Sequence, residues 1–474
     1  MMSRLAKRPR GIDVHSRPWG GRAIIALLMR TWWVGLLLGL ATVLAATSWA
    51  ASMPVTERVS VSSSGGQASG LSFEPALSGS GRFVAFQSLA SDLVPGDTNG
   101  TVDVFVFDRR SRRLERVSVS SSGGEATGGT LAVEPPWLSG GGRIVAFASD
   151  ASGLVAGDTN GVWDVFVRDR SRGRTIRASV RSSGAQANGR SQNLRVSETG
   201  RFVVFESDAS NLVRGDTNRA TDVLVHDLRG GETTRVSVSS GDRQGNGPSS
   251  DPAISADGRF VSFSSEASNL VPGDTNRASD VFVHDRSTHR TLRASLNSLE
   301  RQGSGDSMAS HLAPAGTLVA FTSRASNLVR GDSNRASDIF VRDTAAGRTE
   351  RISVSSTGGQ ANADSNYAAG FAGRRYIAFR SSGSNLVRGD TNAVQDVFVH
   401  DRTTGVTRRV SVGPSGTQAN ASSSSARLSA DGRFVAFASF ASNLVPGDTN
   451  ATNDIFVRGP LRSTRIGYLA RLGG

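Results

Sequence analysis

Residues 255–296 read SADGRFVSFSSEASNLVPGDTNRASDVFVHDRSTHRTLRASL, and this stretch decides the fold. A tight-turn signal, Ala256-Asp257-Gly258, lies between short apolar segments that alternate with polar residues. A long polar loop, residues 264–279, then leads to a second strong apolar segment. The expected strands cover residues 252–255, 259–263, 280–284 and 291–296. No helical period is present, so the unit is four short strands joined by turns and one long loop.

The GDTN motif inside this stretch is the mark of an internal repeat. The motif or a near copy begins at Gly96, Gly157, Gly215, Gly273, Gly331, Gly389 and Gly447. The first spacing is 61 residues and the next five are 58. Seven copies at a nearly fixed period indicate one structural unit made seven times, with each copy packing mainly on its neighbours.

Seven four-stranded antiparallel units predict an all-β fold, a seven-bladed β-propeller over residues 57–459 with a C-terminal tail at 460–474. The last copy lacks a good fourth strand, whereas ERVSVS at 57–62 matches fourth strands elsewhere. We therefore expect residues 58–61 to complete the last blade and close the ring. The alternative is that residues 463–466 take that place.

The strings SADGRFVSF (255–263) and SADGRFVAF (429–437), each followed by DVFV or DIFV and a turn aspartate, resemble the TolB-type, WD-like propeller repeat. The resemblance covers about residues 57–459 and implies the fold. TolB itself has six such blades and a separate N-terminal domain, whereas this chain has seven copies and no room for that domain. Because this repeat serves many roles, TolB's role in the cell envelope is not carried over.

Composition excludes several classes of site. The chain of 474 residues has no cysteine, so it has no disulfide, thiolate metal site or thiol nucleophile. Its net charge is +13, of which residues 1–50 account for +6. The other arginines recur evenly through the repeats beside aspartates, without the clustered basic face and interleaved aromatics that nucleic-acid binding needs. We expect no nucleic-acid partner.

The N-terminal residues carry the pattern of an export signal. Residues 1–30 are basic, residues 31–47 (TWWVGLLLGLATVLAAT) are uncharged and apolar, and Ser48-Trp49-Ala50 offers a cleavage site. Residues 1–50 are therefore predicted to be a signal peptide or, if uncleaved, an N-terminal membrane anchor. In both cases the repeats lie outside the cytoplasm, in the periplasm or the extracellular space, and the membrane is reached only through this segment.

Each repeat also carries a loop of aspartates and asparagines, S-N-L-V-x-G-D-T-N-x-x-x-D. Two interpretations stay open: turn closure and ion pairing by the carboxylates, or a structural Ca²⁺ bound by their oxygens. No other cofactor is expected. The candidate ligands are Asp97, Asn99, Asp103, Asp158, Asn160, Asp164, Asp216, Asn218, Asp222, Asp274, Asn276, Asp280, Asp332, Asn334, Asp338, Asp390, Asn392, Asp396, Asp448, Asn450 and Asp454.

A ligand site is expected where the copies differ. The first strand of each blade should line the central channel, and its residues vary between copies. The candidates for binding a polar or anionic ligand there are Trp137, Arg195, Asp251, His311, Tyr367 and Arg427. We place the ligand surface on the face with the long loops, around the channel. The alternative is that channel residues only face water and vary freely.

Histidine and serine motifs give little support for catalysis. His226, His284 and His400 share a repeat position with arginines, which suggests a solvated strand end. Neither G-x-S-x-G nor H-E-x-x-H occurs, so no catalytic residue is assigned. The sequence favours an exported, monomeric binding module with a protein or glycan partner. The alternatives are a polysaccharide lyase or hydrolase that uses channel residues, and a purely structural envelope protein.

Overall fold

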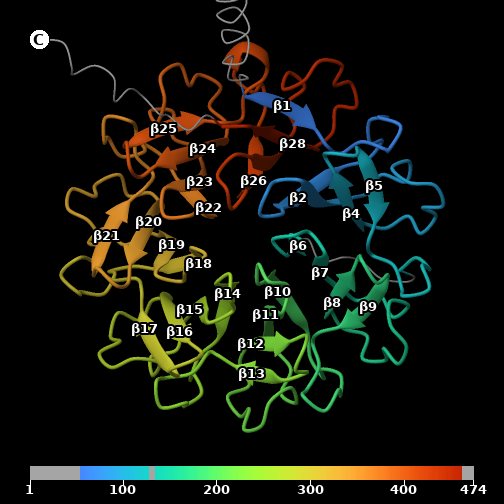
Figure 1. The fold of residues 1–474 in the computed structure, drawn as a ribbon. Helices are drawn as coiled ribbons and strands as arrows, with labels where there is room; N and C mark the ends of the chain where they lie inside the picture. The colour runs from blue at the N-terminus through green and yellow to red at the C-terminus, as the bar shows by residue number, and fades with distance from the viewer. Residues whose placement is uncertain (1–53, 127–133, 462–474) are drawn as a thin grey trace, which may run out of the picture. The chain divides into compact units, whose positions relative to one another are not determined.

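The computed structural model describes residues 54–126 and 134–461. These residues form seven four-stranded antiparallel sheets, which are arranged around a centre as the blades of a ring (Figure 1). The predicted seven-bladed β-propeller is therefore confirmed. We number the blades 1 to 7 in chain order by their innermost strands.

In each blade, strands that follow one another in sequence also lie side by side in the sheet. The innermost strands are β2 (Ser72–Leu77), β6 (Trp137–Leu138), β10 (Ser191–Val196), β14 (Ser249–Ile254), β18 (Ser307–Leu312), β22 (Ser365–Ala372) and β26 (Ser423–Leu428). The second strands are β3 (Phe83–Ser88), β7 (Ile144–Ser149), β11 (Phe202–Ser207), β15 (Phe260–Ser265), β19 (Leu318–Ser323), β23 (Tyr376–Ser381) and β27 (Val435–Ser439).

The third strands all begin with an aspartate: β4 (Asp103–Asp108), β8 (Asp164–Asp169), β12 (Asp222–Asp227), β16 (Asp280–Asp285), β20 (Asp338–Asp343), β24 (Asp396–Asp401) and β28 (Asp454–Gly459). The outer strands are β5 (Arg113–Arg116), β9 (Arg174–Arg177), β13 (Thr233–Arg235), β17 (Arg290–Arg293), β21 (Arg348–Arg351), β25 (Val406–Arg409) and, in blade 7, β1 (Val55–Arg58). One short 3₁₀ turn, η1 (Pro414–Gly416), lies between blades 6 and 7. Among the described residues no helix is long and apolar enough to cross a membrane.

The first strand of the propeller closes the ring. β1 pairs antiparallel with β28, with Val55 opposite Gly459 and Arg58 opposite Phe456. The pairing with the last blade is as predicted, but the strand begins at Val55 and ends at Arg58, three residues earlier than expected. The chain continues in the same direction, because Val59 donates its N–H to the Ile455 carbonyl at 2.8 Å. The alternative closing segment, residues 463–466, lies outside the described residues.

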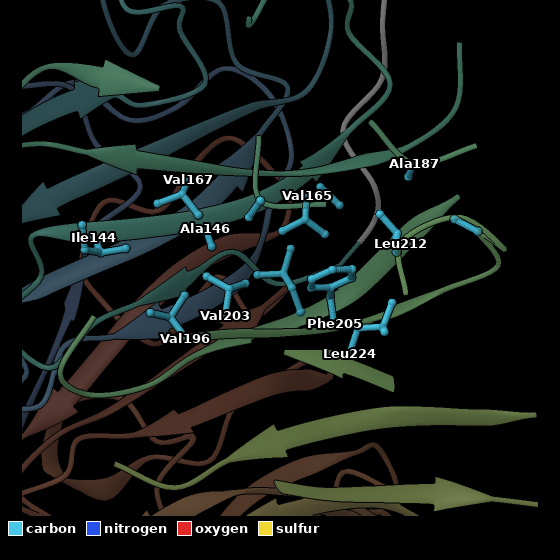
Figure 2. Close-up of a cluster of buried hydrophobic side chains, with 14 residues drawn as sticks. Ile144, Ala146, Val165, Val167, Ala187, Val196, Val203, Phe205, Leu212 and Leu224 are labelled. Atoms are coloured by element: carbon cyan, nitrogen blue, oxygen red, sulfur yellow. The ribbon is translucent and has the colours of Figure 1, made fainter. Parts of the chain in front are cut away.

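The core lies between neighbouring blades. Within a sheet, a phenylalanine of the second strand stacks on its partner in the adjacent third strand, as Phe263 does on Phe282 with ring centroids 5.9 Å apart, and both pack toward the neighbouring blade. Figure 2 shows one such cluster, where Phe205 and Val203 of blade 3 pack against Val165 and Ala146 of blade 2. Each fully buried phenylalanine stabilises the fold by about 1.5–3 kcal/mol. The second-strand phenylalanine recurs in all seven blades and its third-strand partner in six, with Leu224 in blade 3, so the sequence repeat and the packing repeat coincide.

The position shared by histidine and arginine is buried, which corrects the expectation of a solvated strand end. His226 and His284 are only 5% and 3% exposed. The Nδ1 atom of His284 lies 2.9 Å from the hydroxyl of Thr291 on the outer strand. In blade 5 Arg342 takes the same position and donates to Thr349 at 3.2 Å. A threonine on the adjacent strand therefore gives either side chain a polar partner inside the blade.

The two faces of the ring differ in their connections. Short turns join the first strand to the second and the third to the fourth, and we call that side the tight-turn face. The long loops, which include the GDTN motifs, connect the second strand to the third and one blade to the next, and they form the long-loop face. These long connections also cover the outer strands: Ser121, which follows blade 1, accepts the Thr175 N–H of β9 at 2.9 Å. The outer edges are thus bonded to the preceding blade.

Candidate functional site

The innermost strands carry a bulge that shapes the channel. In six blades one residue of this strand has a positive φ, and the register shifts beside it. These residues are Glu74, Asn193, Asp251, Ala309, Tyr367 and Ser425, with φ between 47° and 52°. Non-glycine residues adopt this conformation at a cost of about 1–3 kcal/mol, so the surrounding sheet must hold it in place. The bulge residues and the residues two positions later form two successive layers along the channel.

The later layer brings together four of the predicted residues: Trp137 of blade 2, Arg195 of blade 3, His311 of blade 5 and Arg427 of blade 7. We call them the waist cluster. The guanidinium carbon of Arg195 lies 4.2 Å from the centroid of the Trp137 ring, and that of Arg427 lies 5.2 Å from it. The His311 ring centroid is 6.3 Å from that of Trp137. Two cations therefore share one aromatic ring at the centre of the propeller.

The polar atoms of this cluster have few partners. Arg195 and Arg427 each donate one hydrogen bond to the carbonyl of the preceding residue, at 2.8 and 2.7 Å. Their Nε atoms and the Trp137 Nε1 are buried without a hydrogen-bond partner within the described part of the chain, and the His311 ring nitrogens find none of good geometry. In the same part of the chain no carboxylate pairs with either arginine. Buried donors without acceptors are costly, and an anion would satisfy them.

The surroundings shift the pKa values of the cluster. Burial, followed by the nearby Arg427, lowers the pKa of Arg195 to about 10. Burial also lowers the pKa of Arg427. The pKa of His311 falls well below its usual range because the ring is buried and lies near both arginines. At neutral pH the cluster is therefore two charged guanidiniums beside a neutral imidazole.

A second set of channel residues is acidic. Burial raises the pKa of Glu134 to about 7 and also raises those of Glu206 and Asp251. Glu206 accepts the Asp251 N–H at 3.2 Å, and Glu134 accepts the N–H of Asn193. Asp251 was among the predicted residues, whereas Glu134 and Glu206 were not. The three-residue insertion beside Trp137 obscured the place of Glu134, and Glu206 lies on a second strand that was assigned only to the framework.

Tyr367, the remaining predicted residue, belongs to a second arginine–aromatic pair. The guanidinium carbon of Arg380, on β23, lies 4.1 Å from the centroid of the Tyr367 ring. Burial lowers the pKa of Arg380. Tyr367 is one of the bulge-layer residues, and it is 49% exposed. All six predicted residues thus lie along the channel, four in the waist cluster and two in the bulge layer.

A cavity of about 120 Å³ reaches the waist cluster. All four cluster residues line it, together with residues of the first turn of several blades, among them Gly79, Gly140, Glu198 and Ala256. These turns belong to the tight-turn face. The expectation placed the ligand surface on the long-loop face, whereas this cavity opens on the other side. The short turns leave the ends of the innermost strands uncovered on the tight-turn face. The cavity therefore gives access to the waist cluster from that face.

The aspartate loops form a ring of ion pairs, because in every blade one arginine lies between the two aspartates. In blade 4 the Nη1 atom of Arg293 is 3.0 Å from Asp280 and 3.5 Å from Asp274. The other sets are Arg116 with Asp97 and Asp103, Arg177 with Asp158 and Asp164, Arg235 with Asp216 and Asp222, Arg351 with Asp332 and Asp338, Arg409 with Asp390 and Asp396, and Arg58 with Asp448 and Asp454.

A serine and, in six blades, the asparagine also donate to the second aspartate, whereas in blade 3 Gln244 donates to Asp222 in place of the asparagine. Asn276 donates to Asp280 at 3.2 Å and to the Gly303 carbonyl at 3.0 Å, and Ser295 donates to the other oxygen of Asp280. The buried Asp97 keeps a raised pKa, about 6, because of burial and the nearby Asp103. Within the described residues no group of three His, Cys, Asp or Glu side chains is placed to hold a metal ion. The guanidinium supplies a positive charge at the place where Ca²⁺ was considered.

Comparison with known proteins bears on the fold. No family model and no curated protein matches this chain. A solved oligogalacturonate lyase in complex with manganese is similar at 11% identity, with a TM-score of 0.53, over 86% of this chain and 93% of that one. An oligogalacturonate lyase from Vibrio parahaemolyticus has a TM-score of 0.48 at 11% identity, over 85% of this chain and 93% of that one.

TolB from Acinetobacter baumannii is also similar, at 12% identity and a TM-score of 0.37, over 81% of each chain. Identities this low speak to the fold alone. The repeat strings and the seven four-stranded sheets agree on one architecture, and the similarity to the manganese complex of oligogalacturonate lyase accords with it. This chain therefore has a TolB-like β-propeller fold built from seven repeats.

Proposed function

We propose that this chain is an exported binding module that holds an anionic group of its ligand between Arg195 and Arg427, against Trp137. The observation that carries the proposal is a pair of guanidiniums on one indole ring, from the half-buried Arg195 and the buried Arg427, which form no ion pair with a carboxylate among the described residues. Elsewhere in the ring, buried arginines lie between aspartates. Hydrogen bonds between a guanidinium and an anion are among the stronger ones in proteins, which favours an anion over a neutral ligand here.

The size of the cavity limits what enters the waist. A volume of about 120 Å³ corresponds to about four water molecules at the share of liquid volume that each takes. A carboxylate, sulfate or phosphate group fits this space, whereas a whole oligosaccharide does not. The ligand is then a larger molecule, a glycan or a protein, that presents one acidic group from the tight-turn face.

Export and oligomeric state belong to the proposal as well. The support for export is the basic, then apolar, then small-residue pattern of residues 1–50, which lie outside the described residues. We expect the protein to act as a monomer in the periplasm or outside the cell, without a nucleic-acid partner. Size-exclusion chromatography with light scattering tests the monomer, and fractionation of the producing cells tests the location.

Calorimetric titration of the purified propeller with sodium sulfate tests the anion site. Wild-type protein should bind sulfate, and Arg195→Ala and Arg427→Ala should each weaken binding about tenfold or more, because each removes a charged hydrogen bond of about 1.5–3 kcal/mol. Arg259→Ala is the control, because Arg259 lies in an exposed turn ion pair with Asp285. Equal affinity in wild type and both channel variants would contradict the proposal.

A lyase or hydrolase acting on an acidic polysaccharide is the second candidate. The observation that favours it is the neutral His311 imidazole beside two guanidiniums, since a neutral imidazole can accept a proton while the arginines stabilise an adjacent carboxylate. The similar lyase structure is a manganese complex, and the residues described here offer no comparable group of metal ligands.

Incubation with oligogalacturonate and a panel of other acidic polysaccharides separates the two candidates. A lyase produces an unsaturated sugar that absorbs in the ultraviolet, and His311→Ala and Arg195→Ala should abolish that signal. A binding module gives no product, and the same variants then lose retention of the polysaccharide or of partners in a pull-down. Product formation that survives His311→Ala would remove this histidine from the reaction.

A further inference from the structure

Several neighbouring blades are joined on the tight-turn face by an arginine that follows the third strand. The guanidinium carbon of Arg109 lies 4.2 Å from the ring centroid of Phe434 in the preceding blade. Arg170 lies 4.6 Å from the ring of Phe83 in the same way, and Arg286 lies 4.6 Å from that of Phe202. Each also donates to a glycine carbonyl of its own first turn. We call these the bridging arginines, because they fill the space between two blades.

Between blades 2 and 3 this pair is replaced. Leu228 stands where the bridging arginine is expected, and Ile144 stands where its aromatic partner is expected. A groove of about 550 Å³ lies there. The aliphatic side chains of Ile144, Val167, Ile176 and Leu228 line it. Ile144 and Val167 lie at one end of the interblade cluster, away from Leu212 and Ala187 (Figure 2).

The rim of the groove is basic. Five arginines line it, with Asp169 as the acidic residue among the lining side chains: Arg143, Arg172, Arg174, Arg201 and Arg229. Arg143 and Arg172 bind Asp169, and Arg201 binds Asp227. The exposed side chains of Arg174 and Arg229 make no hydrogen bond or ion pair with any described residue. The groove therefore combines an aliphatic floor with two uncompensated positive charges.

The strand beside the groove limits the kind of occupant. The Thr175 N–H of β9 donates to the Ser121 hydroxyl at 2.9 Å, and that hydroxyl donates back to the Thr175 carbonyl at 3.2 Å. An extended peptide would bring its own N–H and C=O groups, which need partners when buried, and this edge is already bonded. An alkyl chain has no such groups. The floor suits an alkyl chain, and the rim suits an anionic head.

We propose that this groove, between blades 2 and 3 on the tight-turn face, binds a single-chain amphiphile with a carboxylate head, its alkyl chain on Ile144, Ile176 and Leu228 and its head at Arg174 and Arg229. The site is separate from the channel, and its occupant needs no contact with the waist cluster. Burial of the alkyl chain supplies affinity, because each methylene that leaves water contributes favourably. The arginines select the charge of the head.

Titration calorimetry with dodecanoate, kept below its micelle concentration, tests the site. Leu228→Arg introduces the bridging arginine, and Leu228→Arg with Ile144→Phe restores the arginine–phenylalanine pair found at other blade interfaces. Each should weaken binding about tenfold or more, because a filled groove removes most of the buried alkyl area. Arg174→Ala with Arg229→Ala leaves the floor intact and should weaken binding roughly fivefold, since exposed charge pairs contribute modestly. Arg290→Ala, at the position equivalent to Arg174 in blade 4, should bind as wild type does.

Dodecanol has the same chain and no charge, so it should bind the wild type more weakly than dodecanoate does. The double arginine variant should bind dodecanol and dodecanoate with equal affinity. Unchanged dodecanoate affinity in both the Leu228→Arg and the double arginine variants would overturn the proposal, as would loss of binding in Arg195→Ala, which would place the ligand in the channel. Binding of an acidic peptide in place of dodecanoate would also overturn it. A thermal melt of each variant identifies any that fail to fold, and the double arginine variant, which changes only exposed side chains, keeps the test decisive.

Discussion

Two groups of arginines in this propeller have opposite surroundings. The arginines that end the outer strands, such as Arg293, lie between two aspartates and recur in every blade. Arg195 and Arg427 in the channel occur in two blades, share one tryptophan ring and have no carboxylate partner among the described residues. Both groups are removed from water. The repeated arginines have direct ion pairs, whereas Asp251, Glu134 and Glu74 act on Arg195, and Glu74 on Arg427, only through their charge. We propose that an anionic ligand pairs with these two arginines.

The largest expected effect is on the repeated pairs. Asp280→Ala should lower the free energy of unfolding by about 3–5 kcal/mol, because it leaves the buried Arg293 without its nearer carboxylate. Urea denaturation followed by circular dichroism measures the change. Arg259→Ala, in an exposed turn pair, is the control and should change the free energy of unfolding far less. If Asp280→Ala lowers the free energy of unfolding no more than Arg259→Ala does, the buried pairs do not hold the blades more strongly than the exposed turn pairs.

The channel arginine should respond in the opposite direction. Arg195→Met removes a guanidinium that makes no ion pair with any described residue, so the free energy of unfolding should stay level or rise, because the cost of taking that charge out of water is removed. The same urea experiment measures it, with Arg293→Met as the destabilised comparison. If both variants lose the same stability, Arg195 is a structural residue of the ring and not a free cation.

The acidic layer makes anion binding depend on pH. The pKa of Glu134 is raised to about 7, so this carboxyl becomes neutral as the pH falls through that value and no longer competes for Arg195. The sulfate affinity should therefore rise between about pH 8 and about pH 6, while His311 stays neutral throughout. Calorimetric titration at several pH values gives the affinity, and Glu134→Gln should flatten the profile.

The same group predicts the sign of a stability change. A carboxyl with a raised pKa in the folded state holds its proton more tightly there, so the contribution of Glu134 to the free energy of unfolding decreases as the pH rises from the ordinary carboxyl range to about 7, and is constant above. Glu134→Gln should lack this decrease. If the free energy of unfolding changes with pH by the same amount in the wild type and in Glu134→Gln between the ordinary carboxyl range and about pH 7, the assignment is contradicted.

The smallest expected effect concerns divalent cations. Because a guanidinium already lies between the aspartates of each loop, EDTA should leave the melting temperature of the propeller unchanged in differential scanning calorimetry. Added CaCl₂ should not raise it. A reproducible increase with CaCl₂ that EDTA reverses would support the calcium interpretation of these loops, since a ligand that binds the folded state stabilises it.

The fold followed from the sequence because its signals repeat. Each copy of the motif gave the same turns and alternating strands, so seven weak local predictions supported one another, and the missing fourth strand of the last copy identified the closing strand. The boundary of that strand was wrong by three residues, since the fourth-strand pattern continues past Arg58 while the ladder ends there.

The site was harder because its geometry depends on contacts between blades. Variation between copies pointed to Trp137, Arg195, His311 and Arg427, but their shared packing follows from residues far apart in sequence. Glu206 lies on a strand whose pattern shows only framework residues. The sequence places the ligand surface on the long-loop face because the connections there are long, and this stays a prediction, whereas the cavity at the waist cluster lies at the end where the turns are short. The Asp–Arg pairs also could not be read from the loops alone, because the arginine lies on another strand.

The pairing of β1 with β28 has a consequence for how the chain is made. Val55 and Gly459 are partners in one ladder, so the first strand waits, exposed, until nearly the whole propeller has been synthesised. Truncation anywhere before residue 454 leaves that strand without its neighbour and leaves two open sheet edges that other molecules can pair with. Shortened products of this gene are therefore expected to aggregate, even when six complete blades are present.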